Sequence, residues 1–143
     1  LPGAFVYCRG YNRKIARLIT AASDFIVLPS LFEPCGLEDL IAQTYATIPI
    51  ANTQGGLQKI SNGRTGFLYS VPGGQDQDIS EHARVLTEVV AQLAEIFFQS
   101  GKTRLVDIPY FRNIILRAYA ALKTDFAWQH IFEEQYLPLY RSL

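Results

Sequence analysis

Residues 24–29 read Asp-Phe-Ile-Val-Leu-Pro, a run of four apolar residues that a proline stops. A run that is apolar at every position, and not only at alternate positions, is typical of a strand covered on both faces of a sheet. Three further short apolar runs resemble it, at residues 4–8, 48–51 and 67–69. Apolar residues at helical spacing separate these runs, after the potential helix cap Asn12 and over about residues 37–46. The alternation predicts a parallel sheet with helices on both faces.

The second half of the chain carries helical patterns without further strand signals. Residues 73–77 form a polar loop, and Asp78 with Glu81 resembles a capping pair for a long helix that ends near residue 100. Pro109 suits the first turn of the next helix, and Asp125 is expected to cap the last one. The expected buried stripes are Leu86, Val89, Val90, Leu93 and Phe97, then Phe111, Ile114, Ile115, Ala118 and Leu122, then Trp128, Ile131, Phe132 and Leu139.

These patterns predict one α/β domain over residues 1–143, with three layers and a parallel sheet. Its βα units are expected over residues 1–70, and residues 71–143 are expected to be mainly helical. The architecture is that of half a doubly wound domain followed by C-terminal helices.

Composition narrows the classes of function. The 143 residues include thirteen basic and thirteen acidic ones, and this zero net charge argues against a broad face for nucleic acids. No apolar run approaches the ~20 residues that a membrane-spanning helix needs, and the first residues lack the pattern of a signal peptide. Two cysteines, Cys8 and Cys35, fit reduced thiols in a cytoplasmic protein. The absence of methionine predicts a piece of a longer chain.

Two loops at the expected carboxyl edge of the sheet are candidates for a binding site. In residues 29–37, Gly36 allows close backbone approach to a ligand, and Glu33 can accept hydrogen bonds from ligand hydroxyls. The alternative is a proline-stiffened turn that merely starts a helix. In residues 52–57, Gly55 and Gly56 suit either an amide nest for an anion or a tight turn. If both loops meet in one crevice, the pattern favours a ligand that carries phosphate.

Other reactive side chains give weaker signals. His82 is expected on the solvated side of its helix, and His130 has no partner at ligand spacing, so no metal site is expected. Ser30 lacks the surroundings of a hydrolase nucleophile, and Cys35 is expected to be unreactive. Trp128 is expected to pack under the last helix.

Residues 22–30 and 32–37 together resemble the signature of the bacterial glycogen synthase and plant starch synthase family. The resemblance continues through residues 45–50, 55–57, 62–67 and 125–129. It implies a retaining glycosyltransferase of the GT-B fold, in which two Rossmann-like domains enclose the active site. This chain resembles most of the C-terminal, nucleotide-binding domain. The acceptor domain of the family, and the arginine and lysine that clamp the diphosphate, would lie outside it.

The resemblance also implies roles for particular residues. Glu33 would face the transferred glucose and stabilise positive charge at the anomeric carbon. Cys35, Gly36 and Leu37 would border the diphosphate through their backbone amides.

The remaining implied contacts lie in two other segments. Gly55 and Gly56 would approach the donor sugar or its phosphate. Tyr11 resembles the tyrosine that stacks on the nucleobase, and the alternative is a rim tyrosine without a ligand.

Four positions depart from the family pattern. Glu38 and Asp39 replace small or neutral residues; acids there suit the dipole of the helix start but repel a diphosphate. Gln54 removes a hydroxyl from the donor loop, and Ile41 stands where many related enzymes have a second glutamate.

The sequence therefore predicts the donor-binding part of an enzyme that transfers glucose from ADP- or UDP-glucose to an α-1,4-glucan. No metal or other cofactor is expected, the isolated chain is expected to be inactive, and the compartment is the cytoplasm, or the plastid in a plant. One alternative is a non-catalytic binding or scaffolding module derived from such an enzyme, and another is a sister glycosyltransferase with a different acceptor. The cut edge of the sheet predicts self-association.

Overall fold

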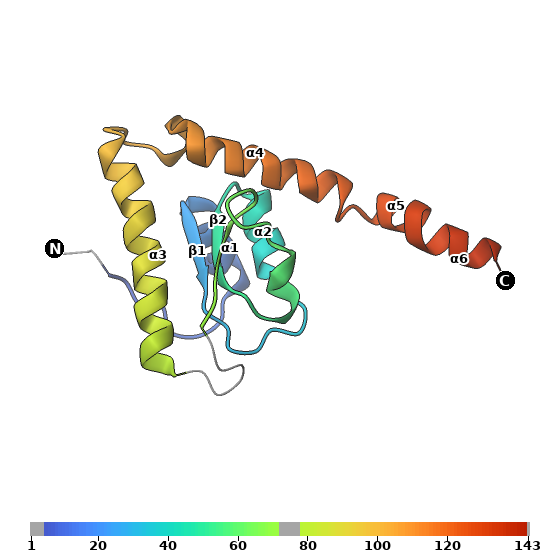
Figure 1. The fold of residues 1–143 in the computed structure, drawn as a ribbon, viewed down its shortest axis with the longest axis horizontal. Coiled ribbons are helices and arrows are strands. Elements are labelled where there is room, and N and C mark those ends of the chain that lie inside the picture. Colours follow the sequence, from blue (N-terminus) through green and yellow to red (C-terminus); the bar gives the residue numbers. More distant parts are fainter. Residues whose placement is uncertain (1–4, 72–77, 143) are drawn as a thin grey trace.

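The computed structural model of the protein describes residues 5–71 and 78–142. Its strands and its first helices alternate along the chain, and helices alone follow (Figure 1). In chain order the elements are α1 (Arg13–Ala22), β1 (Phe25–Leu28), α2 (Glu38–Thr44), β2 (Ile48–Asn52), the 3-10 turn η1 (Gly55–Lys59), β3 (Phe67–Tyr69), α3 (Ile79–Gln99), the 3-10 turn η3 (Leu105–Asp107), α4 (Pro109–Thr124), α5 (Trp128–Ile131), the π-helical turn η4 (Phe132–Tyr136) and α6 (Leu137–Arg141). The expected polar loop at residues 73–77 lies outside the described residues.

The sheet is parallel, as the apolar runs predict. Its strand order is β1-β2-β3, with Phe25 opposite Ile48 and Ile50 opposite Phe67. Every residue of the central strand β2 is buried, which explains why its sequence is apolar almost throughout and does not alternate. All three strands therefore present their carboxyl ends at one edge.

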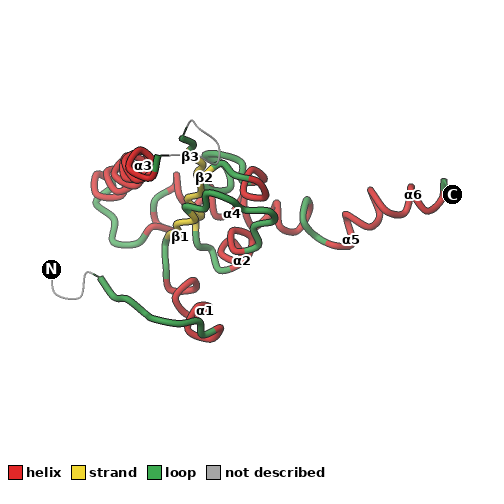
Figure 2. Tube along the Cα trace, turned by 90° about the horizontal axis from the view of Figure 1, so that it is seen from below, coloured by secondary structure: helices red, strands yellow, loops and turns green. Residues whose placement is uncertain are grey.

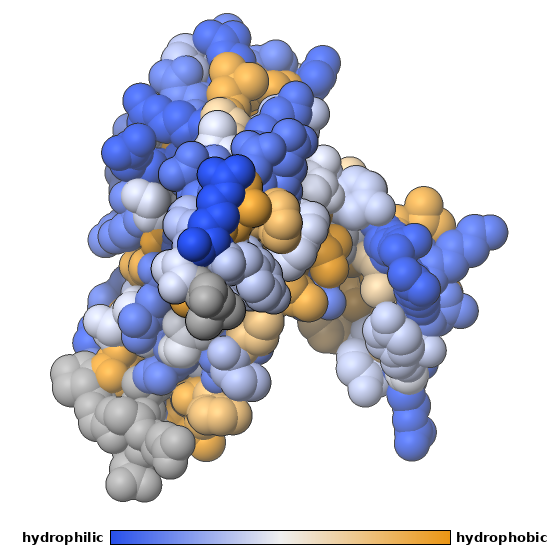
Figure 3. Space-filling model, turned by 90° about the vertical axis from the view of Figure 1, so that its right-hand side faces the viewer, coloured by the Kyte–Doolittle hydropathy of each residue, from blue (hydrophilic) through white to orange (hydrophobic). Residues whose placement is uncertain are grey.

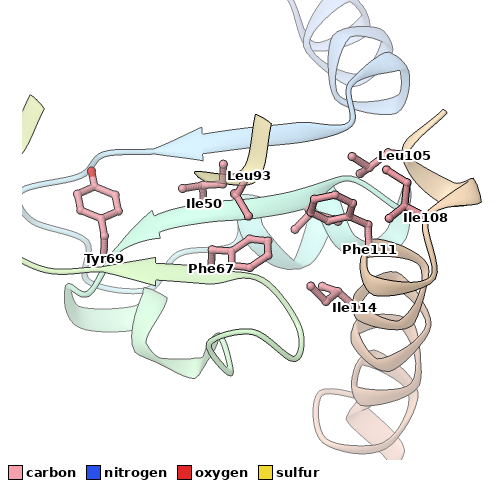
Figure 4. Packing of buried hydrophobic residues seen from close by; sticks show 9 residues of the cluster. Ile50, Phe67, Tyr69, Leu93, Leu105, Ile108, Phe111 and Ile114 are labelled. Atoms are coloured by element: carbon pink, nitrogen blue, oxygen red, sulfur yellow. The ribbon is translucent and has the colours of Figure 1, made fainter. Parts of the chain in front are cut away.

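The sheet has a separate apolar cluster on each face. Ile48 and Ile50 of β2 face the larger cluster, to which α3 contributes Leu93 and α4 contributes Phe111 and other residues (Figure 4). The alternate residue Ala51 faces the smaller cluster, with Leu57 of η1 and Ile60. The predicted three layers are thus confirmed, with α3 and α4 on one face and η1 with α2 on the other.

Local capping explains where several helices begin. The side chain of Asn12 accepts hydrogen bonds from the amides of Lys14 and Ile15, at 3.0 and 3.1 Å, so α1 starts where the sequence predicts. Asp78 likewise accepts from the amide of Ser80 at 2.8 Å at the start of α3. Pro109 occupies the first turn of α4.

The predicted strand at residues 4–8 is wrong over its described part. Residues 5–8 have no strand structure, and Phe5 is 85% exposed. An apolar run becomes a strand only beside a neighbour that satisfies its backbone, and β1 pairs only with β2 among the described residues. The helix α1 buries none of its residues either, and it lies with this segment at the periphery of the sheet (Figure 2).

The expectation of a solvated His82 is also wrong. Its side chain is 7% exposed, and Nε2 lies 2.9 Å from the hydroxyl of Tyr69 and 3.2 Å from the carbonyl of Pro29. The reason is that α3 packs on β3, so this position of the helix faces the end of the strand.

The C-terminal residues form an arm that extends away from the sheet (Figure 1). Asp125 does not cap the last helix: its amide donates to the carbonyl of Ala121 at 2.8 Å, so it ends α4. Trp128 does not pack under a helix but is 67% exposed, with its ring 5.5 Å from that of Tyr136. Within the arm, the ring of Trp128 contacts the rings of Phe132 and Tyr136.

Large apolar side chains reach the surface elsewhere too, among hydrophilic ones (Figure 3). Among the described residues, no helix combines the length and the apolar character that crossing a membrane requires.

Candidate functional site

The loop that follows β1 folds around the side chain of Glu33. The amide of Gly36 donates to Glu33 Oε1 at 2.9 Å, and the hydroxyl of Ser30 lies 3.4 Å from Oε2. The carboxylate is therefore held against its own loop, half-buried, at the edge of the sheet.

The loops after β1 and β2 meet, as their place on neighbouring parallel strands predicts. The side-chain amide of Asn52 donates to the carbonyl of Ser30 at 2.9 Å, and the amide of Gly56 donates to the carbonyl of Glu33 at 2.8 Å. Glu33 is thereby fixed through both its backbone and its side chain.

The two glycines of η1 allow the backbones of the two loops to touch. A Cβ atom on Gly55 would lie 1.9 Å from the carbonyl oxygen of Glu33, and one on Gly56 would lie 1.8 Å from that of Cys35. Gly55 also has a φ of +43°. Close packing of the loops accounts for both glycines, and the amide of Gly56 is already bonded within the protein.

Lys59 is a central residue that the sequence did not single out. Its ammonium donates to the carbonyl oxygens of Cys35 at 3.1 Å and Gly56 at 2.6 Å, and to that of Gly36. It also forms an ion pair with Asp39, with Nζ 3.0 Å from Oδ1. The sequence around Lys59 does not predict these contacts, because Cys35 and Gly36 precede it by more than twenty residues.

Asp39 does more than complement the helix dipole. Its side chain is fully buried, whereas Glu38 beside it is exposed. Burial raises the pKa of the Asp39 carboxyl, and hydrogen bonding to Lys59 offsets part of this effect.

The charge of the site is negative. Residues 29–39 and 53–59 contain three carboxylates, at Glu33, Glu38 and Asp39, against the single cation of Lys59. That cation is already surrounded by protein oxygens. A diphosphate ligand therefore needs cations from outside these two segments.

Three predicted contact residues are open to solvent. Cys35 is a free thiol, and Leu37 is exposed next to the buried Gly36. Tyr11 is 86% exposed and lines a shallow hollow with residues 8–10 and α1. No hydrogen bond or ring contact within the described residues joins Tyr11 to either loop.

In residues 5–71 and 78–142, no three His, Cys, Asp or Glu side chains come together as metal ligands do. An apolar groove of about 260 Å³ lies between β1 and α3, with Phe25, Val27 and Leu93 in its lining. It is lined almost entirely by apolar side chains, so it does not suit phosphate, and it is separate from the Glu33 loop.

Comparison with known proteins supplies relatives along nearly the whole chain. No protein-family model matches it. A glycogen synthase of Vibrio vulnificus is 32% identical over 96% of this chain and 26% of its own length. A glycogen synthase of Thermodesulfovibrio yellowstonii is 35% identical over 94% of this chain and 23% of its own length. Another, of Leptospira biflexa, is 50% identical over 41% of this chain and 12% of its own length.

A solved structure is also similar. The catalytic domain of starch synthase IV from Arabidopsis thaliana, bound to ADP and acarbose, superposes with a TM-score of 0.59. The match has 27% sequence identity and covers 93% of this chain and 25% of that one.

The parallel sheet, its helical layers and this superposition define a glycosyltransferase α/β domain of the GT-B type. The chain belongs to the glycogen synthase and starch synthase family. It spans about a quarter of the length of the curated relatives that match most of it.

Proposed function

We propose that this chain is the donor-binding part of a retaining glycosyltransferase that moves glucose from ADP-glucose or UDP-glucose to an α-1,4-glucan. The main support is the joined pair of loops around Glu33, at the carboxyl edge of a parallel sheet, where such folds bind ligands. Homology to glycogen synthases, and to a starch synthase domain whose structure holds ADP and acarbose, supports the same ligand class.

In this proposal Glu33 holds the hydroxyls of the donor sugar and stabilises positive charge at the anomeric carbon. The backbones of Cys35, Gly36 and Leu37, with Gly55 and Gly56, border the phosphates and sugar, and Tyr11 stacks on the base. No metal takes part, and the enzyme works in the cytoplasm or a plastid.

The isolated chain has no transferase activity in this proposal. The segments around Glu33 carry more carboxylates than cations, and Lys59 is engaged by Asp39. The clamp for a diphosphate and the acceptor site belong to the rest of a full-length enzyme.

An amide NMR titration of the chain with ADP, UDP and inorganic phosphate tests donor binding. We expect shifts at Tyr11, residues 33–37 and Gly55–Gly56, larger with one nucleotide than with phosphate. Glu33→Gln should alter them, whereas Glu134→Gln, a change at an exposed carboxylate of the C-terminal arm, should not. Shifts no larger with either nucleotide than with phosphate would contradict the proposal.

A chimera tests catalysis. The chain replaces the matching quarter of the Vibrio vulnificus glycogen synthase, and transfer from ADP-glucose to glycogen is measured. We expect Glu33→Ala to abolish turnover and Glu38→Ala to retain it. Turnover in Glu33→Ala equal to that of an active unmodified chimera would rule out a catalytic Glu33.

A non-catalytic binding module is the second candidate. The observation in its favour is that the one cation of the two loops is neutralised by a buried carboxylate. An inactive chimera that still folds and binds glucan through its other domain would favour this candidate. A sister enzyme with another acceptor would instead turn over small glycosides in the same assay.

Self-association is the remaining part of the proposal. β1 pairs only with β2 in the described part of the chain, and the apolar groove opens beside it. We expect light scattering of the chain at high concentration to give a mass above that of a monomer.

A further inference from the structure

Lys59 makes an unusually large set of contacts for a partly exposed lysine. Its side chain is 21% exposed, yet its ammonium contacts the carbonyls of Cys35, Gly36 and Gly56 and the carboxylate of Asp39. An ammonium has three N–H donors, so these partners engage all of them. One side chain thereby joins the loop after β1, the first turn of α2 and η1.

One peptide group links this lysine to Glu33. The Cys35–Gly36 peptide accepts from Lys59 through its carbonyl, at 3.1 Å, and donates to Glu33 Oε1 through its amide, at 2.9 Å. The carbonyl and the N–H of a trans peptide point in opposite directions. Turning the carbonyl toward Lys59 therefore turns the N–H toward the carboxylate.

We propose that Lys59 is a positioning residue, which orients the Glu33 carboxylate through the Cys35–Gly36 peptide, and that Asp39 is its counter-ion. Asp39 neutralises the ammonium, so Lys59 holds the carbonyls without adding net charge. What Glu33 does to a donor sugar rests on the proposed function, but the orientation of its carboxylate does not.

A double-mutant cycle measures the coupling at a single amide. Hydrogen exchange of the Gly36 amide is followed by NMR in the wild type, Glu33→Ala, Lys59→Met and the double variant. We expect each single variant to speed exchange by about tenfold, because each removes the Gly36–Glu33 hydrogen bond. The double variant should exchange no faster than either. Lys102→Met, a change at an exposed lysine, serves as the matched control and should leave the effect of Glu33→Ala intact.

A lysine that merely stabilised the fold would give a different result. Its loss would speed exchange throughout β2, and the effects of the two substitutions at Gly36 would multiply. Either of these results would overturn the proposal, as would Gly36 exchange in Lys59→Met within about twofold of the wild type.

A measurement on the unmodified chain keeps the proposal testable if Lys59→Met does not fold. Acylation of lysines by a soluble ester is followed by mass spectrometry. We expect Lys59 to react about tenfold more slowly than the exposed Lys14, Lys102 and Lys123, because acylation requires the loops to open. Asp39→Asn should speed the reaction of Lys59 severalfold. Equal rates for all four lysines, or no effect of Asp39→Asn, would overturn the role of this pair.

The exchange cycle at Gly36 and the nucleotide titration test the two proposals independently. If neither ADP nor UDP shifts the loop amides, donor binding fails. The exchange cycle at Gly36 still decides whether Lys59 orients Glu33.

Discussion

The contact between the two glycines and the Glu33 loop can be tested by a single methyl group. In Gly56→Ala the new Cβ would lie 1.8 Å from the carbonyl oxygen of Cys35, and 2.7 Å from its Cα. Both atoms belong to backbone, so no side chain can turn aside. The loop after β1 must withdraw by roughly an ångström or more, and the hydrogen bond from Gly56 N to the Glu33 carbonyl is lost with it.

The expected cost follows from these two effects. Inserting a methyl into closely packed backbone costs about 2 kcal/mol, and a lost internal hydrogen bond costs about 1 kcal/mol. The reduced freedom of the unfolded chain returns about 0.5 kcal/mol. We expect Gly56→Ala to lower the free energy of unfolding by about 2.5 kcal/mol.

Gly101→Ala is the matched control. Gly101 has a φ of +64°, and no atom lies within 4 Å of the place that its new methyl group would occupy, so the substitution adds backbone strain without a clash. Its expected cost is about 1 kcal/mol. Gly56 has no positive φ, so its substitution adds no strain of this kind. Urea unfolding followed by far-ultraviolet circular dichroism measures both, and a cost for Gly56→Ala no greater than for Gly101→Ala would refute the close approach.

Three further predictions concern the core and its buried polar groups. Phe111 is fully buried, so Phe111→Ala should cost about 4 kcal/mol in urea unfolding, whereas Leu116→Ala, on the exposed side of the same helix, should cost less than about 0.5 kcal/mol. Burial raises the pKa of the Asp39 carboxyl, so the folded state binds more protons than the unfolded state above pH 3.8. Relative to Asp39→Asn, the wild type should therefore gain stability as the pH falls toward that value. A loss of stability would mean that the attraction of Lys59 outweighs the effect of burial. Tyr69→Phe removes the hydroxyl 2.9 Å from His82 Nε2 and should cost about 1 kcal/mol by the same assay; an unchanged midpoint would argue against that bond.

Much of the fold is predictable from the sequence because its strands are short runs of apolar residues, of which the central one, β2, is buried at every position. The run at residues 25–28 is apolar at every position, and the structure makes it a parallel strand beside Ile48–Asn52. The run at residues 5–8 looks the same, but it remains exposed because a strand also needs a neighbour, which no pattern within the run reveals. The burial of His82 escapes prediction for a related reason: it depends on how α3 packs on β3.

The sequence predicts that the two loops of the candidate site meet, but it does not predict the ion pair beside them. The meeting of the loops after β1 and β2 follows from their place on neighbouring parallel strands. The pair of Asp39 and Lys59 does not follow, because its partners lie twenty residues apart and neither residue type is usually buried. Only the folded chain brings the end of η1, at Lys59, to the first turn of α2, at Asp39.

The larger apolar cluster combines residues that are far apart in the sequence, and this has a consequence for synthesis on the ribosome. The strands provide Ile48, Ile50 and Phe67, but the residues that cover them, such as Phe111 and Ile114, come more than forty positions later. A nascent chain that ends before α4 therefore has one face of its sheet without this cover. Because such distant contacts form slowly and exposed strands aggregate, we expect chains truncated before residue 109 to accumulate as insoluble material.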